Sequence, residues 1–209
     1  MEEKAEGTFK CPACGGEAEL FIEETPEGPE KVGTLICKDC GAKEVVTLED
    51  VKDERLEAVK IAVNAERDAF LFYRDAAEKS TNPRGKDMFQ QLSAFEIEHY
   101  KKMIHLYLSL KNENKWIRYT GAGELKAQNR IEGSKGGYET KDDDIQALKT
   151  AIAKEGEAAE FYREMAEKTE DPMGKEMFLK LVEEEETHRR LLNDQYYALQ
   201  NQGEWMWGD

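Results

Sequence analysis

Apolar residues recur at steps of three and four along two stretches of the chain, residues 47–111 and 143–200. This spacing is typical of helices that bury one face. Each stretch is divided by a residue that favours helix N-termini followed by proline, as Asn82-Pro83 and as Asp171-Pro172. The pattern therefore predicts two helix pairs, and the first helix is expected to begin near Thr47-Leu48-Glu49-Asp50.

The two predicted helix pairs are copies of each other. Residues 61–99 align with residues 150–188 without a gap, at a shift of 89 positions, and 17 of the 39 aligned pairs are identical. Residues 112–142 connect the copies and are long enough to return the chain along a bundle, with Trp116, Tyr119 and Tyr138 as candidate anchors. The sequence therefore favours one four-helix bundle with a single long crossover.

Six ionisable residues interrupt the apolar faces at matched positions in the two copies. Each copy has one glutamate on its first helix and a Glu-x-x-His pair, one turn apart, on its second. These residues are Glu66, Glu96, His99, Glu155, Glu185 and His188. One such residue alone is usually a core or ion-paired side chain, but four buried carboxylates repel one another unless cations compensate them. The set therefore predicts two divalent ions, Fe or Mn, held by oxygen and nitrogen ligands.

Other polar residues near this set are expected to have no part in it. Glu185 belongs to a run of four acids, and its neighbours Glu183, Glu184 and Glu186 fall outside the repeat register, so we expect them to be solvated. His105 has no counterpart in the second copy and is expected at the surface or as a filler of the core.

All four cysteines lie near the N-terminus, as Cys11-Pro12-Ala13-Cys14 and Cys37-Lys38-Asp39-Cys40, each followed by glycine. Two such knuckles predict a tetrahedral site for one metal ion, Zn or Fe, within residues 1–46. A segment of this size has no large core, so a metal would stabilise it. Residues 18–22 and 31–36 are expected to pair as strands around a turn at Pro26–Pro29.

Charge and length limit the classes of function. The 209 residues include 45 acidic and 30 basic ones, a net charge of −15, which disfavours nucleic acid or an anionic membrane as partner. The first residues lack the apolar stretch of a signal peptide, and no run of 18 apolar residues is present. We therefore expect a cytoplasmic protein, with no membrane span, built from a four-cysteine module at residues 1–46 and a bundle at residues 47–209.

The order Glu, Glu-x-x-His, Glu, Glu-x-x-His on four helices resembles the established ligand arrangement of ferritin-like di-iron carboxylate bundles. Among these the chain most resembles the rubrerythrin family, over about residues 50–200. The resemblance implies a mainly α fold in which Glu96 and Glu185 bridge two metal ions, Glu66 and Glu155 are terminal ligands, and each histidine binds one ion.

The resemblance also implies an activity. Two adjacent ferrous ions hold the two electrons that an O–O bond needs for reduction, so hydrogen peroxide or dioxygen is the expected substrate, in defence against oxidative stress. An external electron donor, such as a rubredoxin or a reductase, is implied as well. Ferroxidation with iron storage or delivery is the alternative, and a structural di-metal bundle is a third. Bundles of this family usually pair, so we expect a homodimer or a larger homo-oligomer, and Trp205 and Trp207 to pack onto the bundle or a partner.

Two tyrosines and one missing glutamate refine the comparison. Tyr73 and Tyr162 lie seven residues after Glu66 and Glu155 on the same faces, and they resemble tyrosines beside the di-iron site of rubrerythrins. They are candidate catalytic residues that would hydrogen-bond the terminal carboxylates, with simple core tyrosines as the alternative. Rubrerythrins have a further glutamate three residues after the third-helix ligand, where this chain has Ala158, and that difference leaves the peroxidase cycle open.

The four-cysteine module differs from its counterpart in most rubrerythrins, which is a rubredoxin-like iron centre with four cysteine ligands near the C-terminus. Here the module is N-terminal, has only Phe9 and Phe21 as aromatic residues, and its first knuckle resembles that of a zinc ribbon. Both metals accept four thiolates. Zinc is favoured and iron stays open, and the distinction matters because iron relays an electron whereas zinc does not.

Overall fold

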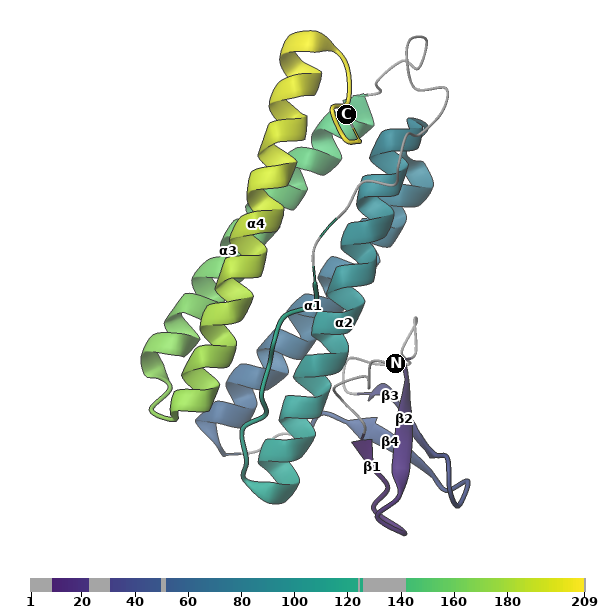
Figure 1. Ribbon diagram of the computed structural model, residues 1–209, viewed down its shortest axis with the longest axis vertical. Helices are drawn as coiled ribbons and strands as arrows, with labels where there is room; N and C mark the ends of the chain where they lie inside the picture. Colours follow the sequence, from purple (N-terminus) through teal and green to yellow (C-terminus); the bar gives the residue numbers. More distant parts are fainter. Residues whose placement is uncertain (1–8, 23–30, 50–51, 124, 126–141, 209) are drawn as a thin grey trace. The chain divides into compact units, whose positions relative to one another are not determined.

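The computed structural model describes residues 9–22, 31–49, 52–123, 125 and 142–208 (Figure 1). Its elements are β1 (Phe9–Lys10), β2 (Glu17–Ile22), β3 (Lys31–Cys37), β4 (Lys43–Thr47), α1 (Glu54–Lys79), α2 (Pro83–Glu113), α3 (Asp142–Lys168) and α4 (Pro172–Gln202). The predicted fold class, a mainly helical ferritin-like bundle with a small N-terminal β module, is confirmed. The chain forms two compact units, Met1–Asn64 with Tyr100–Lys115 and Ala65–His99 with Trp116–Asp209. The domain limits at residues 46 and 47 stay a prediction.

The first unit is built on a four-stranded antiparallel sheet in which each strand pairs with the next along the chain. The predicted pairing of the two middle strands is confirmed, with Ala18 opposite Cys37 and Leu20 opposite Leu35. The predicted turn at Pro26–Pro29 lies outside the described residues. The Tyr100 hydroxyl of α2 donates to the Val32 carbonyl of β3, at 3.0 Å, and so holds α2 against this sheet.

The predicted start of the first helix is wrong. Residues 43–47 continue the sheet as β4, where Val46 lies opposite Gly33, so Thr47 ends a strand and does not cap a helix. Helix α1 begins at Glu54, and the carboxylate of Asp53 accepts the backbone N–H of Arg55 at 2.9 Å. An aspartate at this position satisfies a donor that the first helical turn leaves unpaired.

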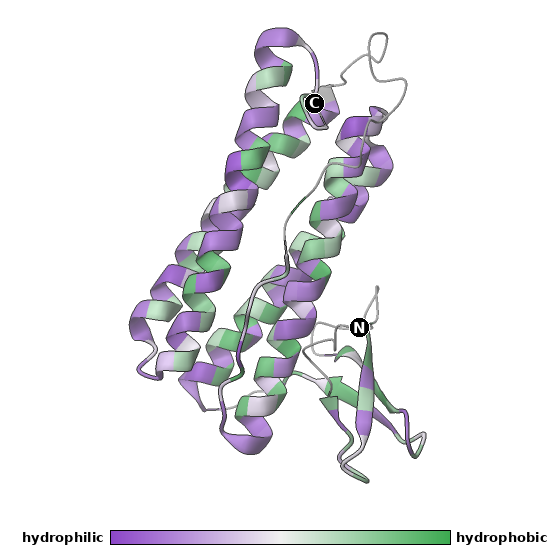
Figure 2. Ribbon diagram, in the orientation of Figure 1, coloured by the Kyte–Doolittle hydropathy of each residue, from purple (hydrophilic) through white to green (hydrophobic). Residues whose placement is uncertain are grey.

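The second unit contains a helical core. Its buried cluster draws residues from all four helices and from the C-terminal tail, and it includes Phe89, Leu92, Leu148, Leu192 and Trp205. Figure 2 shows hydrophobic and hydrophilic stretches alternating along the helices, as the steps of three and four in the sequence require. None of the described helices is long and apolar enough to cross a membrane.

The two short turns between paired helices follow the predicted capping design. Asn82 accepts the backbone N–H of Arg84 at 2.9 Å, and Asp171 accepts those of Met173 and Gly174 at 2.9 and 3.1 Å. In each case proline is the first helical residue, where its missing N–H costs no hydrogen bond. Both predicted caps are thereby confirmed.

A tryptophan from a distant segment covers the first turn of each second helix. The Trp205 ring lies on Gly85 and the Trp116 ring lies on Gly174, the equivalent glycine of the other copy. Trp205 and Trp207 are buried in this unit, so the tail packs on the bundle of its own chain. Trp116 also meets Phe178, with ring centroids 5.8 Å apart, and so holds the start of the crossover against α4. The remaining candidate anchor, Tyr138, lies outside the described residues.

Substitution of Gly85 by alanine is expected to lower the free energy of unfolding by about 1–3 kcal/mol, since the new methyl group would overpack the site. A Cβ atom at this position would lie 2.6 Å from the Trp205 ring, and the same distance separates a Cβ at Gly174 from the Trp116 ring. Urea denaturation of Gly85→Ala and Gly174→Ala measures the effect.

Gly156 provides the matched control for these two variants. It is also helical, but a Cβ there meets nothing closer than the Arg189 side chain at 3.6 Å. Gly156→Ala is therefore expected to be neutral or to stabilise the protein by up to about 1 kcal/mol, the intrinsic helix preference of alanine over glycine. A similar stability change in all three variants would contradict the packing argument.

Candidate metal centres

The second unit brings together all six residues that the sequence selected from the helices. They form two overlapping groups, Glu66, Glu96, His99 and Glu185 in one and Glu96, Glu155, Glu185 and His188 in the other, and within each group the candidate ligand atoms lie within 4.8 Å of one another. Glu96 and Glu185 belong to both groups, and none of the six residues is more than 3% exposed. Two cation positions that share two carboxylates are the arrangement that bridging ligands require.

Each histidine turns its Nδ1 atom toward the carboxylates. His99 Nδ1 lies 3.3 Å from oxygens of both Glu96 and Glu185, and His188 Nδ1 lies 3.4 Å from Glu96 and 3.6 Å from Glu155. Both Nδ1 atoms are buried, and so are one oxygen of Glu96 and one of Glu185; none of these four atoms has a hydrogen-bond partner among the described residues. Unpartnered buried polar atoms are rare, and here four of them converge. Their donor types fit two divalent ions such as Fe or Mn.

Without a metal, Glu66, Glu155 and the two histidines retain protons that they would lose in water. Burial raises the pKa of Glu66 to about 8, and burial together with the Glu185 carboxylate raises the pKa of Glu155 well above its usual value. Burial alone would lower the pKa of His99 and His188, but the surrounding carboxylates outweigh it and raise both. A metal ion must displace such protons when it binds, so metal affinity is expected to rise with pH.

The metal-free protein is expected to lose stability as pH rises from 5 to 8. A group whose pKa is higher in the folded state binds more protons there than in the unfolded chain, so stability falls as pH rises through that window. Glu66, Glu155 and both histidines share this sign, whereas the lowered pKa values of Glu96 and Glu185 act below the usual pKa of 4.5. Thermal melting of the chelated protein at several pH values measures this trend.

The magnitude of that effect follows from the size of the chain. A loss of 1 kcal/mol lowers the melting temperature of a protein of this length by about 2–4 °C. The metal-loaded protein is the control, because bound cations occupy the proton-binding groups and the downward slope should disappear. A melting temperature of the metal-free protein that rises between pH 5 and pH 8 would contradict the assignment of these buried groups.

Each of the two predicted tyrosines contacts a carboxylate of the other helix pair. Tyr73 on α1 donates its hydroxyl proton to Glu155 on α3, and Tyr162 on α3 donates to Glu66 on α1. Both tyrosines are 1% exposed. Each terminal carboxylate is thus held by the tyrosine of the other copy, an arrangement that the repeat alone did not reveal. The catalytic role assigned to these tyrosines stays a prediction.

One residue at the centre was missed, because the sequence placed Glu184 among solvated acids. That expectation is wrong: Glu184 is 8% exposed, and its Oε2 atom lies 3.2 Å from His99 Nε2. Hydrogen bonds from His99 and Tyr119 outweigh burial and hold the pKa of Glu184 below its usual value. An ionised carboxylate only accepts hydrogen bonds, so Nε2 carries a proton, and Nδ1 is the nitrogen that would bind a metal once its own proton is displaced.

The residues near the missing rubrerythrin glutamate supply no substitute. Ala158 occupies the position on α3, and its acidic neighbours Glu157 and Glu160 are exposed. Among the described residues, the two groups around the centre therefore contain four carboxylates and two imidazoles. His105, which the sequence left unassigned, lies in the first unit with its ring 5.0 Å from that of Phe9.

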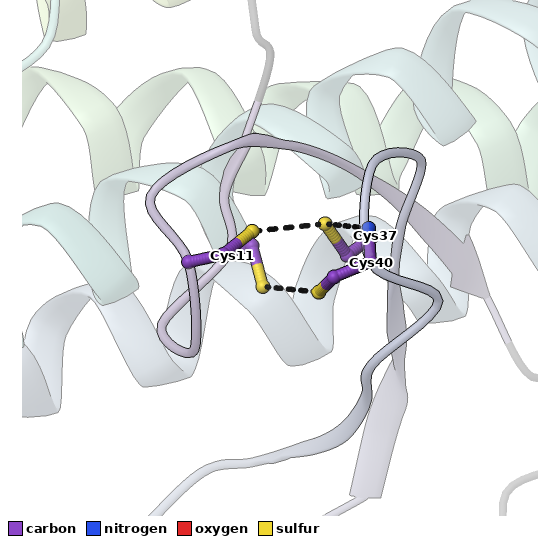
Figure 3. Close-up of side chains that lie close together, drawn as sticks. Cys11, Cys37 and Cys40 are labelled. Carbon is purple, nitrogen blue, oxygen red and sulfur yellow. Dashed lines mark hydrogen bonds between the residues drawn. The ribbon is translucent and has the colours of Figure 1, made fainter.

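The first unit brings the four cysteines together where the β1–β2 and β3–β4 connections meet. Figure 3 shows the side chains of Cys11, Cys37 and Cys40 converging, and the Sγ atoms are 3.8 Å apart for Cys11 and Cys40 and 3.6 Å apart for Cys14 and Cys37. These distances exclude disulfides, whose sulfurs lie about 2.05 Å apart. They match the edges of a tetrahedron, about 3.8 Å long when metal–sulfur bonds are about 2.3 Å.

The second knuckle turn favours a thiolate at Cys37. Gly15 and Gly41 adopt positive φ angles of 72° and 71°, which glycine tolerates. Their backbone N–H groups donate to the carbonyls of Cys11 and Cys37 and so close the two turns. The backbone N–H of Cys40 points at the sulfur of Cys37 and lowers the pKa of that thiol to about 7. A metal ligand must be deprotonated, so this contact prepares Cys37 to bind one, whereas hydrogen bonds with neighbouring thiols raise the pKa of Cys14 and Cys40, whose protons a metal would have to displace.

Comparison with known proteins agrees with this geometry. Residues 146–206 match the family model of rubrerythrin. The predicted resemblance to rubrerythrins is thereby confirmed, and the matched segment contains three of the six bundle residues, Glu155, Glu185 and His188. The match covers most of α3 and all of α4, and it shows that this segment is similar to rubrerythrins.

A solved structure of a hypothetical protein from Pyrococcus furiosus is also similar. The two sequences are 26% identical, the alignment covers 70% of this chain and 90% of that one, and the TM-score is 0.55. A search of curated protein sequences found no match.

Proposed function

We propose that this protein reduces hydrogen peroxide at a carboxylate-bridged di-iron centre, in defence against oxidative stress. The observation that carries the proposal is the pair of overlapping groups that share Glu96 and Glu185, because shared carboxylates keep two metal ions adjacent. Glu66 and His99 would complete one position, and Glu155 and His188 the other. When bound as ferrous ions, the pair supplies the two electrons that convert peroxide and two protons into two molecules of water.

The protein's own side chains would keep that centre in place during turnover. Tyr73 and Tyr162 hold the two terminal carboxylates by hydrogen bonds from the opposite helix pair, and both hydroxyls are buried. Because each of the six candidate ligands is at most 3% exposed, the centre would retain its metal ions. A ferroxidase that stores or delivers iron must release its ions after oxidation, so burial favours peroxide reduction over iron handling.

We also propose that the four-cysteine site holds zinc and has a structural role. Among the described residues of the sheet, Phe9 is buried and Phe21 is 49% exposed, so the module has few aromatic side chains around its sulfurs. A zinc site relays no electron, so electrons would come from a separate donor such as a rubredoxin or a reductase. Metal content per chain by mass spectrometry tests this part: one zinc with two iron supports it, whereas three iron and no zinc indicate a built-in relay.

The decisive experiment is stopped-flow mixing of the di-ferrous protein with hydrogen peroxide and, separately, with dioxygen. Peroxide is expected to oxidise the protein much faster than dioxygen at equal concentration. Oxidation by dioxygen at an equal or higher rate would overturn the peroxidase proposal. Formation of an iron mineral on addition of excess ferrous iron in air would instead support iron handling.

A further inference from the structure

The two histidines of the bundle centre have different environments behind them. His99 Nε2 faces the Glu184 carboxylate at 3.2 Å. The repeat equates position 184 with position 95, where the chain has Phe95, and that ring stands edge-on to His188 at a centroid distance of 5.3 Å. Within the part of the chain that the structure describes, no carboxylate pairs with Nε2 of His188. The six candidate ligands are therefore nearly symmetric, but the residues next to the two histidines are not.

Glu184 is held rigidly where it meets His99. Its Oε2 atom accepts the Tyr119 hydroxyl at 2.5 Å, and its Oε1 atom accepts the backbone N–H of Ala122 at 2.7 Å. Gly121 lies between these two donors with φ +102°, and a Cβ there would be 2.8 Å from Oε1. The crossover thus encloses the carboxylate and fixes its direction toward His99.

A carboxylate behind a metal-binding histidine changes how that histidine binds. It fixes the tautomer and the ring orientation, and it makes the other nitrogen more basic. Loss of such a partner typically weakens metal binding about 10–100-fold. His99 has this support from Glu184, whereas the equivalent residue Phe95, whose ring lies beside that of His188, is apolar and offers no carboxylate.

We propose that Glu184 is a positioning residue that makes the two metal positions unequal, so that the position with His99 and Glu66 binds its ion more tightly and fills first. The inference rests on the proposed di-metal centre. The difference in affinity between the two metal positions would come from Glu184, which is not itself a ligand, and from the crossover residues that orient it. The competing explanation is that Glu184 only anchors the crossover to α4.

The test is an equilibrium titration of the full-length protein with cobalt(II), with zinc kept in the four-cysteine site and the bundle free of metal, followed by absorbance and paramagnetic NMR. The wild-type protein is expected to bind two ions in steps separated about 10-fold or more. Glu184→Gln should weaken the tighter step about 10–100-fold, leave the weaker step unchanged, and shift the paramagnetic Nε2–H signal of one histidine. Tyr119→Phe, which removes one anchor of the carboxylate, should weaken the tighter step less.

Glu183→Gln is the matched control, because Glu183 is the adjacent residue, is exposed, and pairs with Lys180 at the surface. It should leave both steps and the N–H signal unchanged. Two unchanged steps in Glu184→Gln, with a lowered melting temperature, would overturn this inference and leave an anchoring role. A wild-type protein that binds no cobalt in the bundle would overturn the di-metal proposal itself.

Discussion

Replacing Glu96 with glutamine is expected to remove metal from both positions of the bundle. Glu96 belongs to both ligand groups, whereas Glu66 belongs only to the group with His99 and Glu155 only to the group with His188. The amide keeps the size of the side chain but loses its charge, so neither cation would retain a balanced ligand set. Besides the ion of the four-cysteine site, metal analysis should therefore find two ions in the wild type, about one in Glu66→Gln or Glu155→Gln, and none in Glu96→Gln.

The expected loss of affinity in Glu96→Gln exceeds the roughly 10–100-fold that removal of a supporting residue costs. Peroxide turnover should fall to background, and added iron should no longer raise the melting temperature, because metal binding contributes to folding. Glu98→Gln is the control: this glutamate lies two residues further along α2 and is exposed. Retention of two ions by Glu96→Gln would contradict the shared-carboxylate arrangement.

The ligand set was predictable from sequence because it depends on local helical geometry. A Glu-x-x-His pair lies on one helical face, and the repeat showed which face is buried before any tertiary contact was known. The bridging positions Glu96 and Glu185 follow from that register, and the structure places them in both groups. The same spacing predicted that the two tyrosines are buried. It did not predict that each one bonds to a carboxylate of the other helix pair, because that contact depends on how the pairs pack.

Glu184 shows where this reasoning fails. Successive residues of a helix point in directions about 100° apart, so Glu184 points away from the face that carries Glu185. From the sequence alone, that direction is expected to face solvent. The crossover occupies that direction instead, with Tyr119 and Ala122 donating to the carboxylate from 65 and 62 positions away. A contact between a helix and an irregular segment has no periodic signal, so only the folded chain reveals it.

The start of α1 was missed for a related reason. The pattern around Thr47 suits a helix cap, but pairing with β3 extends residues 43–47 into a fourth strand. Strand pairing is set by partners distant in sequence and outweighs local preference. The pairing of β2 with β3 was predictable because the cysteine knuckles limit where each strand can start and end.

Replacing Cys37 with serine is expected to remove the metal of the four-cysteine site and unfold the sheet while the bundle persists. Cys37 is 3% exposed, and its sulfur lies among the four that define the tetrahedron. A structural zinc contributes about 10–16 kcal/mol to the folding of small zinc domains, more than the core of so small a sheet supplies. Metal content should fall by one ion per chain, and backbone amides of β2 and β3 should lose their protection from hydrogen exchange.

Lys38→Ser is the control for this variant, because the same serine is placed one residue further along the knuckle. The Lys38 side chain is 52% exposed and pairs with Glu17 at the surface, so its loss should leave metal content and amide protection unchanged. Circular dichroism should show that Cys37→Ser keeps its helices, since the bundle has its own core and its own ligands. A sheet that stays protected after loss of the metal would show that the strands are stable without it, and that the knuckles serve binding or electron transfer and not folding.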